Sequence, residues 1–201
     1  KVSNKVCFKG GTALRLLFKS PRFSEDLDFD IVLTKKEIGF LVKETEEDLK
    51  RELPVLEVKI LYSGKNGMRF RLKLDIPELK FPAVVRMDFT HVNKIEAVTS
   101  SLRTDFPVVI LPLIYHFSLP DILRGKFLAL TERDKGRDLF DILFLLRAKT
   151  EFKRKDINKK ILDKIKKFPQ VKLTRDLTPF LPQSQRKIIP ILKKELVDAL
   201  K

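Results

Sequence analysis

The chain has 201 residues, of which 42 are lysine or arginine and 27 are aspartate or glutamate, so its formal net charge is +15. A hydrophobic content of 43% supports a real core and excludes a disordered chain, and the length permits one α/β domain or a compact core with an appended helical region. One cysteine excludes an intramolecular disulfide framework. We find no secretory signal and no apolar stretch that could span a bilayer, so we expect a cytoplasmic protein without a membrane partner.

The first elements form a strand, a turn and a helix that are suited to bind phosphate. Val6 to Phe8 predict a short buried strand, and Gly10 and Gly11 allow a tight turn. Thr12 can cap a helix over residues 13–18. Such a turn and helix N-terminus offer unsatisfied N–H donors and a favourable dipole to an anion. We expect a nucleotide triphosphate here; the alternative is an ordinary turn followed by a helix cap.

Two carboxylates follow in the next predicted strand. Asp26 and Asp28 are two residues apart in a segment that alternates like a strand, so both project to one side while Leu27 and Phe29 face the core. Adjacent carboxylates repel each other unless a cation lies between them. Mg²⁺ prefers such oxygen ligands and completes its shell with substrate phosphates. We therefore expect Mg²⁺ or Mn²⁺ at this pair; the alternative is a surface Asp-x-Asp without a metal.

The middle of the chain fits an α/β core. Thr34 to Glu37 form a capping box ahead of a helix that ends before Pro54. Residues 55–62 and 68–76 alternate like the two strands of a hairpin, and residues 84–89 predict a further strand.

Two helices are predicted further along the chain. The first opens at Pro120 and carries Lys126 beside its apolar stripe, so this ammonium group is positioned to meet a partner. The second is apolar over residues 139–146 except for Asp141. An ionised group in such a helix is costly unless it is paired. The pattern predicts a salt bridge from Asp141 to Arg137 or to Lys126, and leaves open whether the pair is structural or functional.

Two parts of the chain carry a family resemblance, Phe8–Leu17 with Arg22–Phe29, and Ile122–Leu130 with Arg133–Asp141. The first has the Gly-Gly-Thr turn followed by Asp-x-Asp. The second has a lysine, Ala-Leu, an arginine and then Arg-Asp-x-x-Asp. Together they resemble the AbiEii/AbiGii toxin-type nucleotidyltransferases, relatives of the MenT toxins in the DNA polymerase β-like superfamily. The resemblance covers about residues 6–147. Family members usually have helices before the first strand, so we expect further residues to precede Lys1.

The resemblance implies an α/β fold, with a polymerase β-like nucleotidyltransferase core of mixed sheet followed by a helical, basic C-terminal region. It also implies an NTP substrate and a divalent metal. The expected catalytic residues are Asp26, Asp28, Asp88, Lys126, Asp138 and Asp141. The expected nucleotide contacts are Lys9, Gly10, Gly11, Thr12, Arg22, Ser24 and Lys126. In this interpretation Lys126 contacts the phosphates and Asp141 holds that lysine.

A polymerase-like transferase also needs a third carboxylate on a neighbouring strand, as a metal ligand and to help deprotonate the attacking hydroxyl. Asp75 and Asp88 both lie in strand-like segments. We favour Asp88 as the third metal ligand beside Asp26 and Asp28, because Pro77 marks the end of the strand that carries Asp75. The alternative is that Asp88 caps a strand or pairs with Arg86.

The positive charge is concentrated at the C-terminal end. Residues 149–201 contain 16 basic and 6 acidic side chains, whereas residues 1–148 contain 26 and 21. An amphipathic helix around Ile161 carries much of this excess on Lys159, Lys160, Lys164, Lys166 and Lys167. We draw the domain boundary between residues 1–117, the core, and 118–201, the helical region. The basic helix is either a solvated surface or a binding face for RNA phosphates.

The resemblance implies the toxin of a type IV toxin–antitoxin or phage-defence pair that transfers a nucleotide to RNA. Because the MenT relatives modify tRNA, tRNA is the leading acceptor, and a cognate antitoxin is expected to be encoded nearby. Two alternatives stay open. One is nucleotidyl or phosphoryl transfer to a protein or a small molecule. The other is a basic nucleic-acid-binding module without activity. The acidic pair argues against this alternative, because a pure binding module gains nothing from negative charge beside its anionic ligand.

Overall fold

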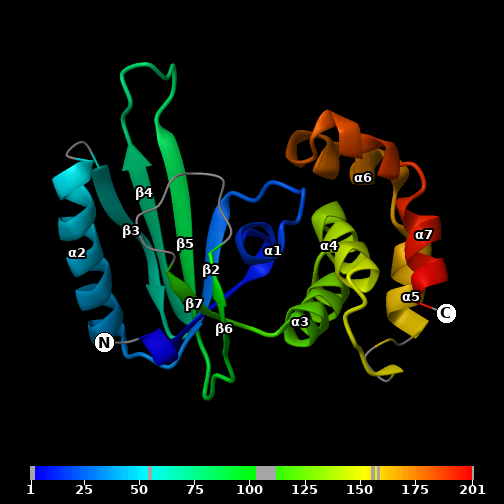
Figure 1. Cartoon of the computed structure of the whole chain (residues 1–201), viewed down its shortest axis with the longest axis horizontal. Helices are drawn as coiled ribbons and strands as arrows, with labels where there is room; N and C mark the ends of the chain where they lie inside the picture. Colours follow the sequence, from blue (N-terminus) through cyan, green and yellow to red (C-terminus); the bar gives the residue numbers. More distant parts are fainter. Residues whose placement is uncertain (1–2, 54–55, 103–111, 155–156, 158, 201) are drawn as a thin grey trace. The chain divides into compact units, whose positions relative to one another are not determined.

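The computed structural model describes the chain except for residues 1–2, 54–55, 103–111, 155–156, 158 and 201 (Figure 1). The chain divides into two compact units, which we call unit 1 (residues 1–13 and 25–116) and unit 2 (residues 14–24 and 117–201). The domain boundary expected from the sequence, after residue 117, lies one residue from this division. Residues 14–24 differ from the expectation, because they pack with the C-terminal helices rather than with the sheet.

A mixed sheet of seven strands forms unit 1 in the described part of the chain. Its order is β3-β4-β5-β2-β1-β7-β6. The pairs β2–β5 and β1–β7 are parallel, and the other neighbours are antiparallel. The strands are β1 (Val6–Lys9), β2 (Asp26–Ile31), β3 (Leu56–Gly64), β4 (Gly67–Leu74), β5 (Ala83–His91), β6 (Val98–Ser101) and β7 (Leu113–His116). The predicted hairpin is β3–β4, with a turn of two residues.

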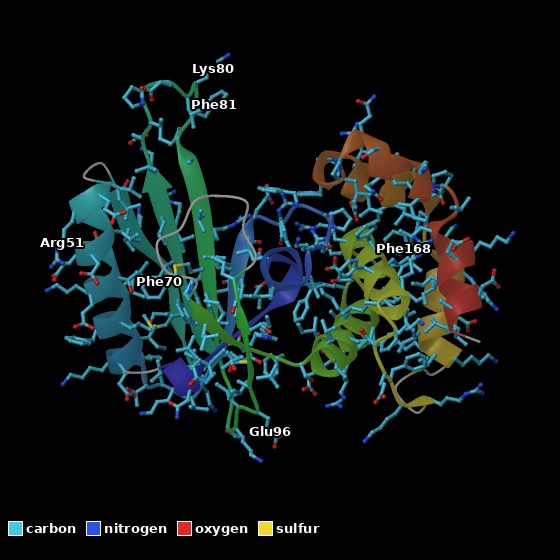
Figure 2. The ribbon with its side chains drawn as sticks, viewed as in Figure 1. Arg51, Phe70, Lys80, Phe81, Glu96 and Phe168 are labelled. Carbon is cyan, nitrogen blue, oxygen red and sulfur yellow. The ribbon has the colours of Figure 1, made fainter. Side chains whose placement is uncertain are left out.

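One face of this sheet is covered by α2 (Lys35–Glu52), as Figure 1 shows. The helix begins at the predicted capping box, in which the Thr34 hydroxyl accepts from the Glu37 N–H and the Glu37 carboxylate accepts from the Thr34 N–H. Its buried residue Ile38 packs into a core with Phe70, which points between helix and sheet (Figure 2). Amphipathic burial of this kind stabilises a helix more than intrinsic propensity does.

Three phenylalanines on the core face fix the register of the central strands. Phe8, Phe29 and Phe89 are paired across β1, β2 and β5. Their rings stack, with 5.1 Å between the centroids of each neighbouring pair. Since a slip of one residue would turn every side chain to the other face, this stack also sets which residues align on the opposite face. Asp28 and Asp88 are aligned there.

Unit 2 is helical. Helix α1 (Gly10–Phe18) begins in unit 1 and enters unit 2 at Leu14, which is fully buried in the unit 2 core. The remaining helices are α3 (Leu119–Glu132), α4 (Gly136–Arg147), α5 (Lys159–Lys167), α6 (Gln170–Leu177) and α7 (Leu192–Ala199). The 3₁₀ helices are η1 (Ser3–Lys5) in unit 1, and η3 (Thr178–Phe180) and η4 (Gln183–Ile188) in unit 2. The α/β class and the helical C-terminal region expected from the sequence are confirmed.

Candidate active site

The turn between β1 and α1 is built around Gly10. Its φ of +81° favours glycine, and a Cβ at this position would lie 2.3 Å from Oδ2 of Asp28. The helix begins at Gly10, so Thr12 is its third residue and not its cap, contrary to our prediction. The Thr12 hydroxyl instead donates to the backbone oxygen of Asp26. This bond ties the first turn of α1, with its free N–H groups, to the strand that carries the acidic pair.

The acidic pair lies on the face of the sheet opposite the phenylalanine stack. Asp26 and Asp28 are both half-buried in β2. Asp30 continues the same row and forms an ion pair with Lys9, the residue of β1 that precedes the turn. Lys9, expected as a nucleotide contact, therefore has a carboxylate partner within unit 1.

Asp88 lies directly beside Asp28. The two residues are partners in the parallel β2–β5 ladder, so their carboxylates share one face of the sheet. Asp75, the alternative third carboxylate, lies just beyond the end of β4, is exposed and accepts from Lys73 at 2.8 Å. The register therefore brings Asp88, and not Asp75, next to the acidic pair.

Two arginines neutralise these carboxylates. Arg86 Nε lies 2.8 Å from Asp26 Oδ1, and Arg69 Nε donates to Asp88 Oδ1. The hydrogen bond and the charge of Asp88 raise the pKa of Arg69 above its ordinary value. The sequence suggested Arg86 as the partner of Asp88. It missed Arg69, which lies beside Asp88 only because of the β4–β5 register.

The donor set fits a divalent cation such as Mg²⁺. Asp26, Asp28 and Asp88 offer only oxygen ligands, on one face of two adjacent strands. The carboxylate of Asp28 lies against the bare Cα of Gly10, in space that any larger residue would fill. Among the described residues, however, no three acidic, histidine or cysteine side chains converge closely enough to hold a metal. To hold a metal, Asp26 and Asp88 would have to turn away from Arg86 and Arg69.

A second charged cluster lies in unit 2, around Lys126. Helix α3 places this residue on its buried face, beside Ile122 and Phe127. The Lys126 ammonium lies 3.1 Å from Asp138 Oδ1 and 2.7 Å from Asp141 Oδ2. The predicted pair of Lys126 with Asp141 is present, and Asp138 is a second partner.

Arg22 is the other partner of Asp141. Its Nε and Nη2 donate to the two oxygens of Asp141 at 2.7 and 2.9 Å, and its Nη1 donates to the Phe23 carbonyl. Arg22 is only 3% exposed, so its guanidinium is engaged inside unit 2, although the sequence suggested a nucleotide contact. Of the two partners predicted for Asp141, Lys126 is the one observed, and Arg137 lies over the Phe180 ring at 4.7 Å.

Arg133 completes the cluster at its solvent end. This arginine donates to both oxygens of Asp138, at 2.9 and 3.0 Å. The charges then alternate from Arg22 through Asp141, Lys126 and Asp138 to Arg133, and the cluster carries a net charge of +1. The sequence motif contained Arg133, but its role was not predicted. Ser24 is half-buried and lies in the segment between α1 and β2.

Burial and pairing act in opposite directions on these groups. Burial raises the pKa of Asp141 and of Asp138, but the charges of Lys126, Arg22 and Arg133 more than offset it, so both carboxyl pKa values lie below the ordinary range. Burial likewise lowers the pKa of Lys126, and the charges of Asp141 and Asp138 outweigh it and raise that pKa. Asp138, Asp141 and Lys126 are therefore ionised at neutral pH.

The basic helix α5 has a packed side and a solvated side. Ile161 and Ile165 are buried in the unit 2 core. Lys164 is half-buried and pairs with Asp134 at 2.8 Å. The other lysines of this helix are exposed: Lys159, Lys160, Lys166 and Lys167.

Comparison with known proteins identifies the family of this chain. The model of the family described as "Nucleotidyl transferase AbiEii toxin, Type IV TA system" matches residues 2–200. The chain belongs to this AbiEii family. It is thus a nucleotidyltransferase toxin of the type IV toxin–antitoxin class, and a cognate antitoxin is implied. No curated protein matches the sequence.

Two solved structures show the fold of this AbiEii-family chain. JHP933 from Helicobacter pylori has a TM-score of 0.58 and 19% identity, with 99% of this chain and 87% of that chain covered. MenT4, a nucleotidyltransferase toxin from Mycobacterium tuberculosis, has a TM-score of 0.57 and 14% identity, with 98% and 75% covered. The nucleotidyltransferase fold expected from the sequence is confirmed. No helix in the described ranges is long and apolar enough to cross a membrane.

Proposed function

We propose that this AbiEii-family toxin transfers a nucleotide from an NTP to RNA in a reaction that depends on Mg²⁺ or Mn²⁺, with tRNA as the leading acceptor. The observation that carries the proposal is the close approach of Asp28 to Gly10, with Asp26 on the same face and Asp88 in register beside it. A phosphate-binding turn and three carboxylates then belong to one site in unit 1. The resemblance to MenT toxins supports the choice of tRNA.

In this reaction the acceptor hydroxyl attacks the α-phosphorus of the NTP, the bond to the bridging oxygen breaks, and pyrophosphate leaves. The free N–H groups of Gly10, Gly11 and Thr12 bind phosphate oxygens. Asp88 leaves Arg69 and accepts the proton of the attacking hydroxyl. A divalent ion, which Asp26, Asp28 and Asp88 would hold, supplies neutralising charge for the phosphates.

The charged cluster of unit 2 is part of the proposal. We assign Lys126 the neutralisation of phosphate charge during transfer, with Asp141 and Asp138 as the residues that hold its ammonium group. The two short contacts of Lys126 support a fixed cation rather than a mobile surface lysine. Arg22 becomes a positioning residue, because it reaches the reaction only through Asp141.

The test is to incubate the purified chain with each α-labelled NTP and total RNA, with Mg²⁺, with Mn²⁺ and with a chelator. We expect label on RNA from at least one NTP, and none with chelator. Asp28→Asn should abolish labelling with an unchanged circular dichroism spectrum, since the lost group is a ligand rather than a packed residue. Asp48→Asn is the matched control, because Asp48 is an exposed carboxylate on α2.

Two outcomes would contradict the proposal. Full RNA labelling by a folded Asp26→Asn/Asp28→Asn variant would overturn the site. Label that appears on protein or on a small molecule, with none on any RNA, would overturn the acceptor and favour the alternative transfer reaction.

A further inference from the structure

The polar face of the sheet in unit 1 carries a row of basic side chains that ends at the acidic pair. In the β3–β4 ladder Lys59 is the partner of Arg71, and in the β4–β5 ladder Arg71 is the partner of Arg86. Arg86 is in turn the partner of Asp26 in the β2–β5 ladder. Partners in a ladder point to the same face, so these four side chains form one row across four strands.

A second, adjacent row runs parallel to the first. It contains Tyr62, Arg69, Asp88 and Asp28, which are successive partners across β3, β4, β5 and β2. On the other side of the first row, Lys73 extends the basic side chains along β4. The face therefore presents five cations, Lys59, Arg69, Arg71, Lys73 and Arg86. Of these, Arg69 and Arg86 are paired with the carboxylates of the proposed site, and Lys73 is paired with Asp75 just beyond β4. Glu57, the β3 partner of Lys73, lies on the same face.

The first row contains three cations and one carboxylate, so its charges are not balanced within the row. Like charges that are direct partners in a sheet destabilise it. In the described part of the chain, Arg86 has Asp26 as its counter-ion, but neither Lys59 nor Arg71 forms an ion pair. The Nε of Arg71 is moreover buried without a hydrogen-bond partner among those residues. A buried donor of this kind costs free energy, so Arg71 is not held in place by a hydrogen bond from its Nε.

The ligand whose charge and shape fit this row is an extended anion. The cations follow strands about 4.8 Å apart, so they span more than one phosphate. Tyr62 is half exposed at the side of the row and offers an aromatic ring on which a base can stack. A single-stranded nucleic acid has both the repeated phosphates and the bases, whereas an acidic protein segment would not use the ring in this way.

We infer that the β3–β4–β5 face binds the backbone of the RNA acceptor and leads its reacting end to the carboxylates. This inference rests on the proposed function for the identity of the acceptor, but the surface itself is argued from unit 1 alone. Lys59, Arg71 and Lys73 contact the phosphates, and Arg69 and Arg86 lie where the strand meets the site. Helix α5 is the other basic surface that the sequence offered; its apolar side packs in the unit 2 core and its exposed lysines form a solvated side.

The test is equilibrium binding of a short, unstructured, fluorescein-labelled RNA over a series of salt concentrations, without NTP and without divalent metal. The sheet variant is Lys59→Gln/Arg71→Gln/Lys73→Gln. Each lost phosphate contact removes about 0.7 from the slope of log affinity against log salt for a single strand, so we expect a decrease of about 2. Its urea midpoint should be unchanged or higher, because uncompensated like charges are removed.

The matched control is Lys35→Gln/Lys36→Gln/Lys43→Gln, which removes the same charge from exposed positions on α2 and should leave the slope nearly unchanged. A parallel variant changes Lys159, Lys160, Lys166 and Lys167 of α5 to Gln. The inference is overturned if the sheet variant keeps the parental slope, or if the control variant lowers it equally. It holds if the slope falls in the sheet variant, whatever α5 contributes. Because no NTP is present, failure of transfer chemistry would not alter this result.

Discussion

Removal of Asp141 is the sharpest test of the unit 2 cluster. Asp141 is fully buried and accepts from Arg22 and Lys126. In Asp141→Ala, Lys126 keeps Asp138, but among the described residues the buried guanidinium of Arg22 keeps only the Phe23 carbonyl. Since breaking a buried pair leaves an uncompensated charge, we expect a loss of about 3–5 kcal/mol in the free energy of unfolding.

The same geometry ranks the other variants. Lys126→Met leaves Asp141 with Arg22 and Asp138 with Arg133, so no ion is orphaned and the cost should be about 1–3 kcal/mol. Arg22→Met combined with Asp141→Leu removes both partners of one pair. This double variant should cost less than the sum of the single changes, by about 1–3 kcal/mol.

The assay is urea unfolding followed by far-ultraviolet circular dichroism at neutral pH, since urea is uncharged and leaves ion pairs unscreened. Nucleotide incorporation is measured on the same preparations. A cost of less than about 1 kcal/mol for Asp141→Ala, the range of exposed ion pairs, would contradict a buried pair, and so would additive costs of the Arg22 and Asp141 changes.

Three further predictions follow from single geometric features. The carboxyl pKa values of Asp138 and Asp141 are lowered by folding, so below the unfolded value of about 3.9 the unfolded chain binds more protons. The urea midpoint should therefore fall as the pH drops below about 4, and it should fall less in Arg22→Met/Asp141→Leu; equal slopes would contradict this assignment. Gly10→Ala should lose incorporation and about 1–2 kcal/mol because of its positive φ and the Asp28 contact, whereas Gly39→Ala, with open space around it, should be neutral or slightly stabilising. Arg86→Gln should tighten Mn²⁺ binding in calorimetric titrations about five-fold, roughly 1 kcal/mol, by freeing Asp26, and weaker binding would show that Arg86 supports the metal site.

Local patterns in the sequence were sufficient to predict the strands and helices that carry the acidic pair and the Lys126 cluster. The turn before α1, the alternation of Asp26 and Asp28, and the two helices around Lys126 and Asp141 depend on neighbours within a few residues. Glycine conformation, strand alternation and helical spacing act at that range. The start of α1 was misplaced because Gly10 and Gly11 can either precede a helix or enter it, and the sequence does not distinguish the two.

The sequence by itself determined which residues are chemically available: the acidic pair, the glycine turn, the buried lysine and its carboxylates. Only the tertiary structure decided which of these charged side chains form ion pairs with one another. Arg22 and Asp141 are 119 residues apart, and Asp26 and Arg86 are 60 apart. Their contacts depend on the packing of residues 14–24 into unit 2 and on the register that the Phe8, Phe29 and Phe89 stack imposes. Strand register and helix packing depend on the free energy of the whole chain. They therefore cannot be predicted from a short window of sequence.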